Sequence, residues 1–139
     1  MNLRAIVYAS EAIPGLSNER IHDLAQSACR FNLQAGVTGV LLYDGRRFFQ
    51  YLEGPEDGMA IVYARVLAAR SHHEIVELCR GRITARHFPY WSMRMLPAKA
   101  YELQAAASFD WYGVTRSAGL EQLTQIVHPY LPGSDPQAA

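Results

Sequence analysis

One polar side chain interrupts a strongly apolar stretch of this chain, Phe48-Phe49-Gln50-Tyr51-Leu52. A primary amide carries two N–H donors and an acceptor oxygen, and burying it without partners costs about 1–3 kcal/mol. Gln50 therefore needs a polar partner, and the sequence leaves two kinds open. One is a neighbouring backbone group or tyrosine hydroxyl, and the other is a bound polar ligand.

Residue types that enzymes use in known catalytic motifs lack the other residues of those motifs here. His73-Glu74-Ile75-Val76-Glu77 begins like the zinc motif H-E-x-x-H but has a glutamate in place of the second histidine. The chain has no G-x-S-x-G nucleophile elbow, no phosphate-binding P-loop and no G-x-G-x-x-G fingerprint. We therefore expect neither an enzyme nor a metal site.

Two further patterns favour plain structural roles. Gly36-Val37-Thr38-Gly39 matches a weak nucleic-acid loop pattern without flanking lysines, so a helix-to-strand turn is favoured. Glu53, Glu56 and Asp57 flank a predicted helix start, where acidic groups complement the helix dipole. We assign these three to solvation and capping.

Composition predicts one soluble domain. The chain has 139 residues, 50% of them hydrophobic, and 13 Lys and Arg balance 13 Asp and Glu, so no net charge favours nucleic acid or a membrane surface. The N-terminal stretch of residues 1–8 is followed by the polar Ser10-Glu11 before a signal peptide or membrane span could form, which predicts a cytoplasmic protein. Cys29 and Cys79 are expected to be small buried hydrophobes.

The elements that must position Gln50 follow from apolar periodicity. Residues 3–9 form a predicted strand, after which Ser17 or Asn18 caps a helix that ends near Gly36. Residues 37–43 and 46–53 form a predicted hairpin about Asp44-Gly45. Gly54-Pro55 opens a second helix, and residues 74–83 and 91–96 are two more predicted strands. The apolar stripes of the two helices are Ile21, Leu24, Ala25, Ala28 and Phe31, and Met59, Val62, Tyr63 and Val66.

This β-α-β-β-α-β-β order predicts an α+β, ferredoxin-like sheet with two helices on one face. Such a fold places the first strand beside the third, which makes Tyr8 a neighbour of Gln50. Because the third strand is apolar on both sides, the helical residues 98–131 are expected to cover the second face or to form a dimer contact. We thus expect residues 1–97 to form the main domain, 98–131 a helical extension and 132–139 a disordered tail.

Taken together, these segments closely resemble the BLUF family of blue-light sensors that use FAD. The resemblance runs from about residue 3 to 96 and is carried by Tyr8, Asn32, residues 36–43, residues 47–55 and residues 88–93. It implies a flavin-binding domain that holds FAD noncovalently between the two helices and signals through a partner protein or an oligomer change. A small-ligand binding module and an acylphosphatase-like hydrolase, both without photoactivity, are the alternatives.

The resemblance also implies roles for single residues. Tyr8 would give an electron and then a proton to the light-excited flavin, and Gln50 would rotate or change tautomer. Trp91 and Met93, expected on one face of the last strand, would relay the signal. The cofactor-binding residues would be Tyr8, Leu24, Ala28, Arg30, Phe31, Asn32, Leu41, Phe48, Gln50, Arg65, Val66, His72 and Met93.

Some of these positions keep a structural alternative. Asn32 would otherwise cap the end of its helix, Arg65 would be an exposed arginine, and Trp91 would be plain core. The chain departs from the usual family pattern at two points. Phe31 stands where a polar residue is common, and Ala69-Arg70-Ser71-His72 replaces D-P-R-H.

Overall fold

The computed structural model describes residues 2–111 and 116–131. Its core is a five-stranded sheet with the strand order β4-β1-β3-β2-β5, in which β2 and β5 are parallel and the other pairs are antiparallel. The strands are β1 (Leu3–Ala12), β2 (Thr38–Tyr43), β3 (Arg47–Pro55), β4 (His72–Ile83) and β5 (Arg94–Pro97). The helices are α1 (Asn18–Ala35), α2 (Glu56–Ala68), α3 (Ala100–Ser108), α4 (Arg116–Val127) and the 3-10 turn η1 (His128–Tyr130).

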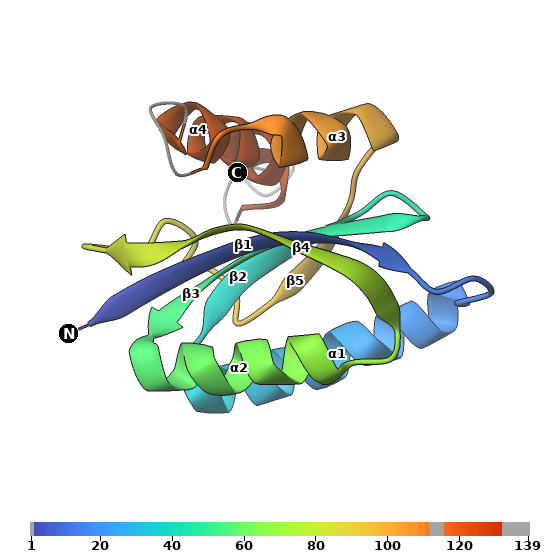
Figure 1. Ribbon diagram of the computed structural model, residues 1–139, viewed down its shortest axis with the longest axis horizontal. Coiled ribbons are helices and arrows are strands. Elements are labelled where there is room, and N and C mark those ends of the chain that lie inside the picture. The colour runs from blue at the N-terminus through green and yellow to red at the C-terminus, as the bar shows by residue number, and fades with distance from the viewer. Residues whose placement is uncertain (1, 112–115, 132–139) are drawn as a thin grey trace, which may run out of the picture.

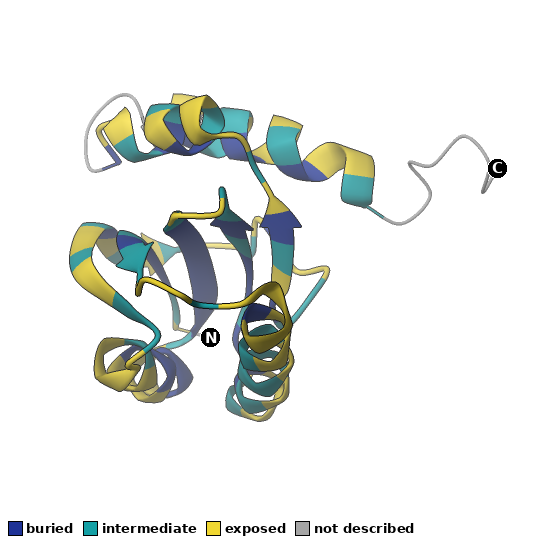
Figure 2. Cartoon of the chain, turned by 90° about the vertical axis from the view of Figure 1, so that its right-hand side faces the viewer, coloured by how far each residue is buried: buried dark blue, intermediate teal, exposed yellow. Residues whose placement is uncertain are grey.

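The sheet lies between two helical layers. Figure 1 shows α1 and α2 on one face and α3 and α4 on the other, and in Figure 2 the buried residues gather where the layers meet. This confirms the predicted fold class, including the C-terminal helices on the second face. None of the helices in the described ranges is long and apolar enough to cross a membrane.

Short polar contacts fix the ends of the elements as the sequence predicts. The Ser17 side chain accepts a hydrogen bond from the Arg20 amide at the start of α1, and Gly36 ends that helix with a φ of 74°. In the hairpin, Gly45 has a φ of 97°, and the Asp44 carboxylate accepts hydrogen bonds from the amides of Arg46 and Arg47 at 2.8 and 2.7 Å. The turn thereby sets the pairing of β2 with β3.

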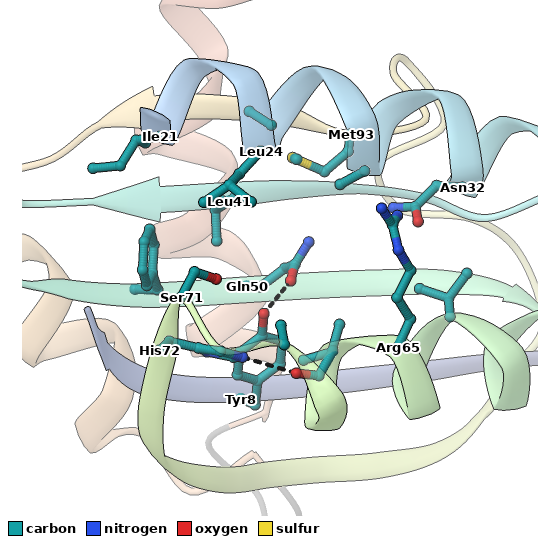
Figure 3. Close-up of a pocket in the computed structure, with 16 residues that line it drawn as sticks. Tyr8, Ile21, Leu24, Asn32, Leu41, Gln50, Arg65, Ser71, His72 and Met93 are labelled. Atoms are coloured by element: carbon teal, nitrogen blue, oxygen red, sulfur yellow. Dashed lines mark hydrogen bonds between the residues drawn. The ribbon is translucent and has the colours of Figure 1, made fainter. Parts of the chain in front are cut away.

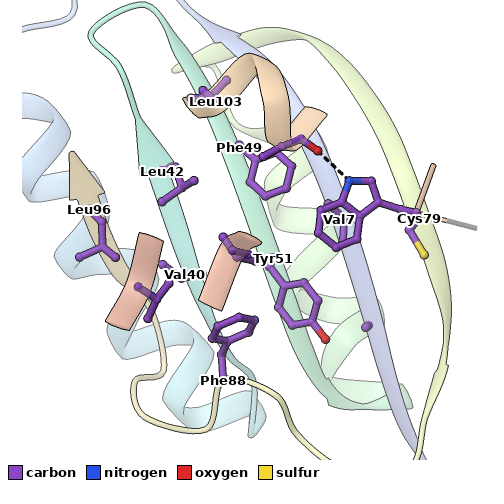
Figure 4. Close-up of a cluster of buried hydrophobic side chains, with 14 residues drawn as sticks. Val7, Val40, Leu42, Phe49, Tyr51, Cys79, Phe88, Leu96 and Leu103 are labelled. Atoms are coloured by element: carbon purple, nitrogen blue, oxygen red, sulfur yellow. Dashed lines mark hydrogen bonds between the residues drawn. The ribbon is translucent and has the colours of Figure 1, made fainter. Parts of the chain in front are cut away.

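Strand β3 sends alternate side chains into the two layers. Phe49 and Tyr51 join the core beneath α3 and α4, where the Trp111 indole donates a hydrogen bond to the Ala106 carbonyl at 2.9 Å (Figure 4). Leu52 joins the core beneath α2. The apolar bulk on both sides of this strand is explained by these two cores.

Glu53 does not have the solvated capping role that the sequence indicated. Its side chain is fully buried and accepts hydrogen bonds from the amides of His87 and Phe88, at 2.9 and 2.6 Å, and from the Tyr51 hydroxyl at 3.0 Å. The prediction failed because the two amide donors come from the irregular segment between β4 and β5. Glu56, by contrast, is exposed and pairs with Arg4.

The last strand is shorter than predicted, and this changes the expected placement of Trp91 and Met93. The strand begins only at Arg94, so the alternation of a strand does not apply to the two preceding residues. Trp91 packs against the core beneath α3 and α4, whereas Met93 lies on the α1 side of the sheet. The expectation that both share one face is therefore wrong.

Candidate functional site

A cavity opens between α1 and α2, with the sheet as its floor (Figure 3). Its empty volume is about 770 Å³, part of which is open to solvent. Most of its wall is apolar, and a few polar side chains point into it, among them Tyr8, Asn32 and Gln50.

The two helices hold the cavity open along most of their length and meet at one end. Gly58 at the start of α2 approaches Ala35 at the end of α1 so closely that an added Cβ would lie 2.1 Å from the Ala35 carbonyl oxygen. Beyond this contact Ile21 is buried, but the middle of the apolar stripe of α1 faces the cavity. Leu24 and Ala28 are accordingly only half-buried and line the cavity.

Tyr8 and Gln50 meet at the floor of the cavity. They are directly opposite each other in the antiparallel pair of β1 and β3, as the sequence predicts. The Tyr8 hydroxyl donates a buried hydrogen bond to the Gln50 amide oxygen. Gln50 Nε2 has no hydrogen-bond partner among the described residues and points away from Tyr8 in Figure 3. The oxygen of the Gln50 amide thus has a protein partner, whereas its nitrogen is available to a molecule in the cavity.

The Tyr8 phenol strongly favours its protonated form. Burial raises its pKa well above the ordinary value near 10, and the neighbouring Tyr63 phenol adds a smaller effect in the same direction. The two rings lie 6.1 Å apart. At neutral pH, Tyr8 is therefore a hydrogen-bond donor rather than a phenolate.

Asn32 lies at the end of the cavity where the helices meet. It is buried, and its side-chain nitrogen donates to the Ser92 carbonyl oxygen at 3.2 Å, while its Oδ1 has no partner among the described residues. The alternative role as a helix cap is wrong, because Gly36 ends α1 and the Asn32 side chain contacts another segment. An acceptor oxygen that can be reached from the cavity therefore remains at this end.

Arg65 and His72 line the cavity, and the protein engages one guanidinium nitrogen of the exposed Arg65 and both ring nitrogens of His72. The Arg65 guanidinium crosses from α2 to α1, where it donates to Ser27 Oγ at 2.8 Å and lies 4.5 Å from the centroid of the Phe31 ring. His72 Nε2 donates to the Val66 carbonyl at 2.8 Å, so Nδ1 is left to accept from the Ser10 hydroxyl at 2.7 Å. His72 thus offers the cavity mainly a ring surface.

Most of the residues singled out in the sequence line this one cavity, and two do not. Those at the cavity are Tyr8, Leu24, Ala28, Asn32, Leu41, Phe48, Gln50, Arg65, Val66, His72 and Met93. Arg30 is outside it and exposed, because it stands two residues from both Ala28 and Asn32 and so falls on the opposite face of α1. Phe31 is half-buried beneath Arg65 rather than at the cavity.

Several residues of the cavity wall were not predicted. Ile21, Ala25 and Val62 belong to helix stripes that the sequence assigned to core, so their periodicity was visible but not their role. Ala69 and Ser71 follow α2, and the sequence marked them only as part of the segment that departs from the family pattern. Ser92 touches α1 twice, through Asn32 and through Cys29 Sγ at 2.9 Å, and could be found only in three dimensions.

Fold and cavity together define a ferredoxin-like α+β domain with a small-molecule site between its two helices. The family described as "Sensors of blue-light using FAD" (BLUF) matches residues 3–94. The chain therefore belongs to the BLUF family of flavin-binding blue-light sensors.

Individual relatives agree with this assignment. The chain is 33% identical over 100 residues to the blue light- and temperature-regulated antirepressor BluF of Escherichia coli K12, which covers 72% of this chain but only 25% of that protein. The structure of BlrB, a BLUF protein in its dark state, is similar with a TM-score of 0.74 and 30% identity, covering 91% of this chain and 96% of that one. BlrP1 of Klebsiella pneumoniae, solved with FMN and cyclic diGMP, gives a TM-score of 0.64 and 29% identity over 83% of this chain and 29% of that one.

Proposed function

We propose that the cavity between α1 and α2 binds FAD noncovalently and that Tyr8 and Gln50 form its light-responsive pair. The observation that carries this proposal is the buried hydrogen bond from Tyr8 to Gln50 on the floor of a mostly apolar cavity. When bound, the flavin would supply blue-light absorption and a one-electron oxidant.

The polar atoms that the protein leaves without partners suit the edge of a flavin ring. Gln50 Nε2 is a donor and Asn32 Oδ1 an acceptor, and the ring edge carries both carbonyl acceptors and an imide N–H donor. The apolar side chains of Leu24, Ala28 and Val66 would line the faces of the ring. Leu41 and Phe48 from the sheet would support its buried edge.

Gln50 is suited to act as a switch because its amide can exchange donor for acceptor. In the present arrangement its oxygen accepts from Tyr8 and its nitrogen is directed elsewhere. A half-turn of the amide would make Tyr8 the acceptor and would offer the cavity an oxygen instead of N–H groups. Conversion to the imidic acid tautomer would likewise change which atom donates. Either change would alter the hydrogen bonding of whatever occupies the cavity.

We further propose that the signal leaves through residues 91–94. Met93 lines the cavity, Ser92 contacts α1, and Trp91 packs against the core on the opposite side of the sheet. The Arg94 guanidinium lies over the rings of both Trp91 and Tyr130, and its Nη1 donates to the Tyr130 carbonyl at 3.2 Å. A change at Met93 would thereby reach the C-terminal helices, whose exposed surfaces would bind a partner protein or a second copy of the chain.

An absorption spectrum tests the first part of the proposal. Purified protein should be yellow, and blue light should shift the flavin absorption reversibly to the red. A protein that remains colourless after incubation with FAD would contradict flavin binding. A yellow protein without the red shift would contradict the switch. For the output route, hydrogen exchange of residues 91–131 should differ between dark and light, and equal protection would exclude it.

A further inference from the structure

Helix α2 is apolar on the face turned away from the sheet as well as on the face turned towards it. Met59, Val62 and Tyr63 are buried in the core between the helix and the sheet. The residues along the opposite face are all apolar and all exposed, namely Ala60, Ile61, Ala64, Leu67 and Ala68. Ile61 and Leu67 keep 57% and 53% of their surface accessible. Figure 1 shows this helix in the outer layer of the molecule.

The neighbouring helix α1 does not share this feature. Its outer face carries Glu19, Asp23, Gln26 and Arg30, all of them exposed, as a surface helix normally does. A helix that is apolar on both faces is normally buried on both. Exposed apolar patches of this kind mark interaction surfaces in soluble proteins. The outer face of α2 is therefore expected to be covered by a partner.

The outer face of α2 is arranged symmetrically about Ala64. Ala60 and Ala68 each lie four residues from this alanine, and Ile61 and Leu67 each lie three residues from it. An antiparallel copy of α2 centred on Ala64 would place Ile61 against Leu67 of the second copy, and Ala60 against its Ala68. A two-fold interface requires this symmetry, because each copy presents the same patch to the other. The alanines would let the two helices approach closely.

The charged residues at the two ends of this face fit the same arrangement. Asp57 stands seven residues before Ala64, and Arg70 stands six residues after it. Both are exposed, and neither forms an ion pair within the described ranges. In one chain they are separated by the length of a 13-residue helix, about 20 Å. In the antiparallel pair, Asp57 of each copy would lie near Arg70 of the other.

We propose that a second copy of this chain covers the outer face of α2, in an antiparallel pairing of the two helices about Ala64. The inference goes beyond the proposed light response and does not depend on bound flavin. One helix of this length buries a small interface, so the dimer should be weak, with a dissociation constant in the micromolar range. The pairing leaves α3 and α4 free for the output route, because they lie on the other side of the sheet (Figure 1).

Sedimentation of the 139-residue chain in the dark, over a range of concentrations, tests this inference. The wild-type protein should dimerise reversibly as its concentration rises. In the double variant Ile61→Gln/Leu67→Gln, the dissociation constant should rise at least about tenfold, because the apolar side chains of the interface are gone. Glutamine keeps a high helix propensity. Leu33→Gln is the matched control, since Leu33 on α1 is 70% exposed and should leave the dissociation constant unchanged.

An exchange of charges tests the register of the two helices. Asp57→Lys and Arg70→Glu should each weaken the dimer, because each brings like charges together across the interface. The double variant Asp57→Lys/Arg70→Glu should recover the wild-type dissociation constant, since opposite charges meet again. This recovery cannot arise within one chain, where the two residues are at opposite ends of α2. Added salt should reduce the differences among these variants.

The outcomes that would overturn the proposal are distinct. A wild-type chain that stays monomeric up to about 1 mM would leave the outer face of α2 to a different partner. A dimer that is unchanged in Ile61→Gln/Leu67→Gln would have its interface elsewhere, and an equal loss in Leu33→Gln would show that the effect is not specific to α2. Absence of recovery in the charge-exchange variant would refute the antiparallel register. Thermal unfolding of each variant is the check on folding, and Ile61→Gln alone carries the test if the double variant unfolds.

Discussion

The side-chain nitrogen of Asn32 donates a hydrogen bond to the backbone oxygen of Ser92, 3.2 Å away. This contact joins α1, which forms one wall of the cavity, to the segment that precedes β5. The same segment carries Met93 into the cavity and Trp91 into the opposite core. Three consecutive residues therefore contact the helix, the cavity and the second core.

Tyr8→Phe should retain bound flavin and lose the light-induced red shift. The substitution removes the hydroxyl that donates to Gln50 but keeps the ring and its packing. The measurement is the difference between dark and illuminated absorption spectra. Tyr63→Phe is a suitable control, because that ring is also buried and lies 6.1 Å from Tyr8. A normal red shift in Tyr8→Phe would exclude the assigned role.

Gln50→Leu should likewise bind flavin without a red shift. Leucine has nearly the same size but cannot exchange donor for acceptor, so the switch would be missing while the floor of the cavity stays filled. Flavin content and the dark–light difference spectrum are the two readouts. A variant that shows the red shift would mean that another group changes its hydrogen bonding to the flavin.

Arg94→Gln should separate the photochemistry from its output. The red shift should be unchanged, because Arg94 is outside the cavity, whereas the light-dependent change in hydrogen exchange of α3 and α4 should decrease. Arg80→Gln is the control, since that guanidinium lies 5.2 Å from the Tyr63 ring instead. An undiminished response in Arg94→Gln would show that the signal takes another path.

Glu53→Ala should destabilise the fold by about 3 kcal/mol, because two buried donors and one part-buried donor would lose this acceptor. Denaturant unfolding of the flavin-free protein measures this free energy. Glu56→Ala removes an exposed ion pair with Arg4 and should cost less than about 1 kcal/mol. Similar losses in the two variants would contradict the anchoring role of Glu53.

Alkaline pH should destabilise the folded chain through Tyr8. Burial raises the folded-state pKa of this phenol, so above about pH 10 the unfolded chain releases a proton that the folded chain retains. Stability is therefore fully present below that pH and is lost as the pH rises. Unfolding free energies of the flavin-free protein at about pH 8 and about pH 11 should differ less for Tyr8→Phe than for the wild type. Tyr101→Phe, at an exposed tyrosine, is the control, and an unchanged difference in Tyr8→Phe would refute the assignment.

The features that the sequence predicted correctly depend on short-range patterns. The Asp44-Gly45 turn and the alternation of β3 fix the strand register, and the strand order then makes Tyr8 the neighbour of Gln50. The apolar stripes likewise predicted which faces of α1 and α2 turn inward. The domain boundary at residue 97 stays a prediction, and the tail at 132–139 lies outside the described residues.

The features that the sequence missed depend on partners far along the chain. Glu53 was misplaced because its donors at His87 and Phe88 belong to a segment without periodic structure. Trp91 and Met93 were misplaced for the same reason, since the alternation of a strand was assumed three residues too early. The assignment of Arg30 to the cofactor site rested on the family resemblance alone, and in the structure the residue lies on the face of α1 that is turned away from the cavity.

The contact of Gly58 with Ala35 also limits the distance between the two helices at one end of the site. Any larger residue at position 58 would force the two helices apart at that end, because its Cβ would overlap the Ala35 carbonyl oxygen. Because Gly58 has no side chain, the helices can approach closely at this end, and this close approach limits how thick a molecule can lie between them. Gly58→Ala would change ligand shape selectivity without altering a single group that touches the ligand.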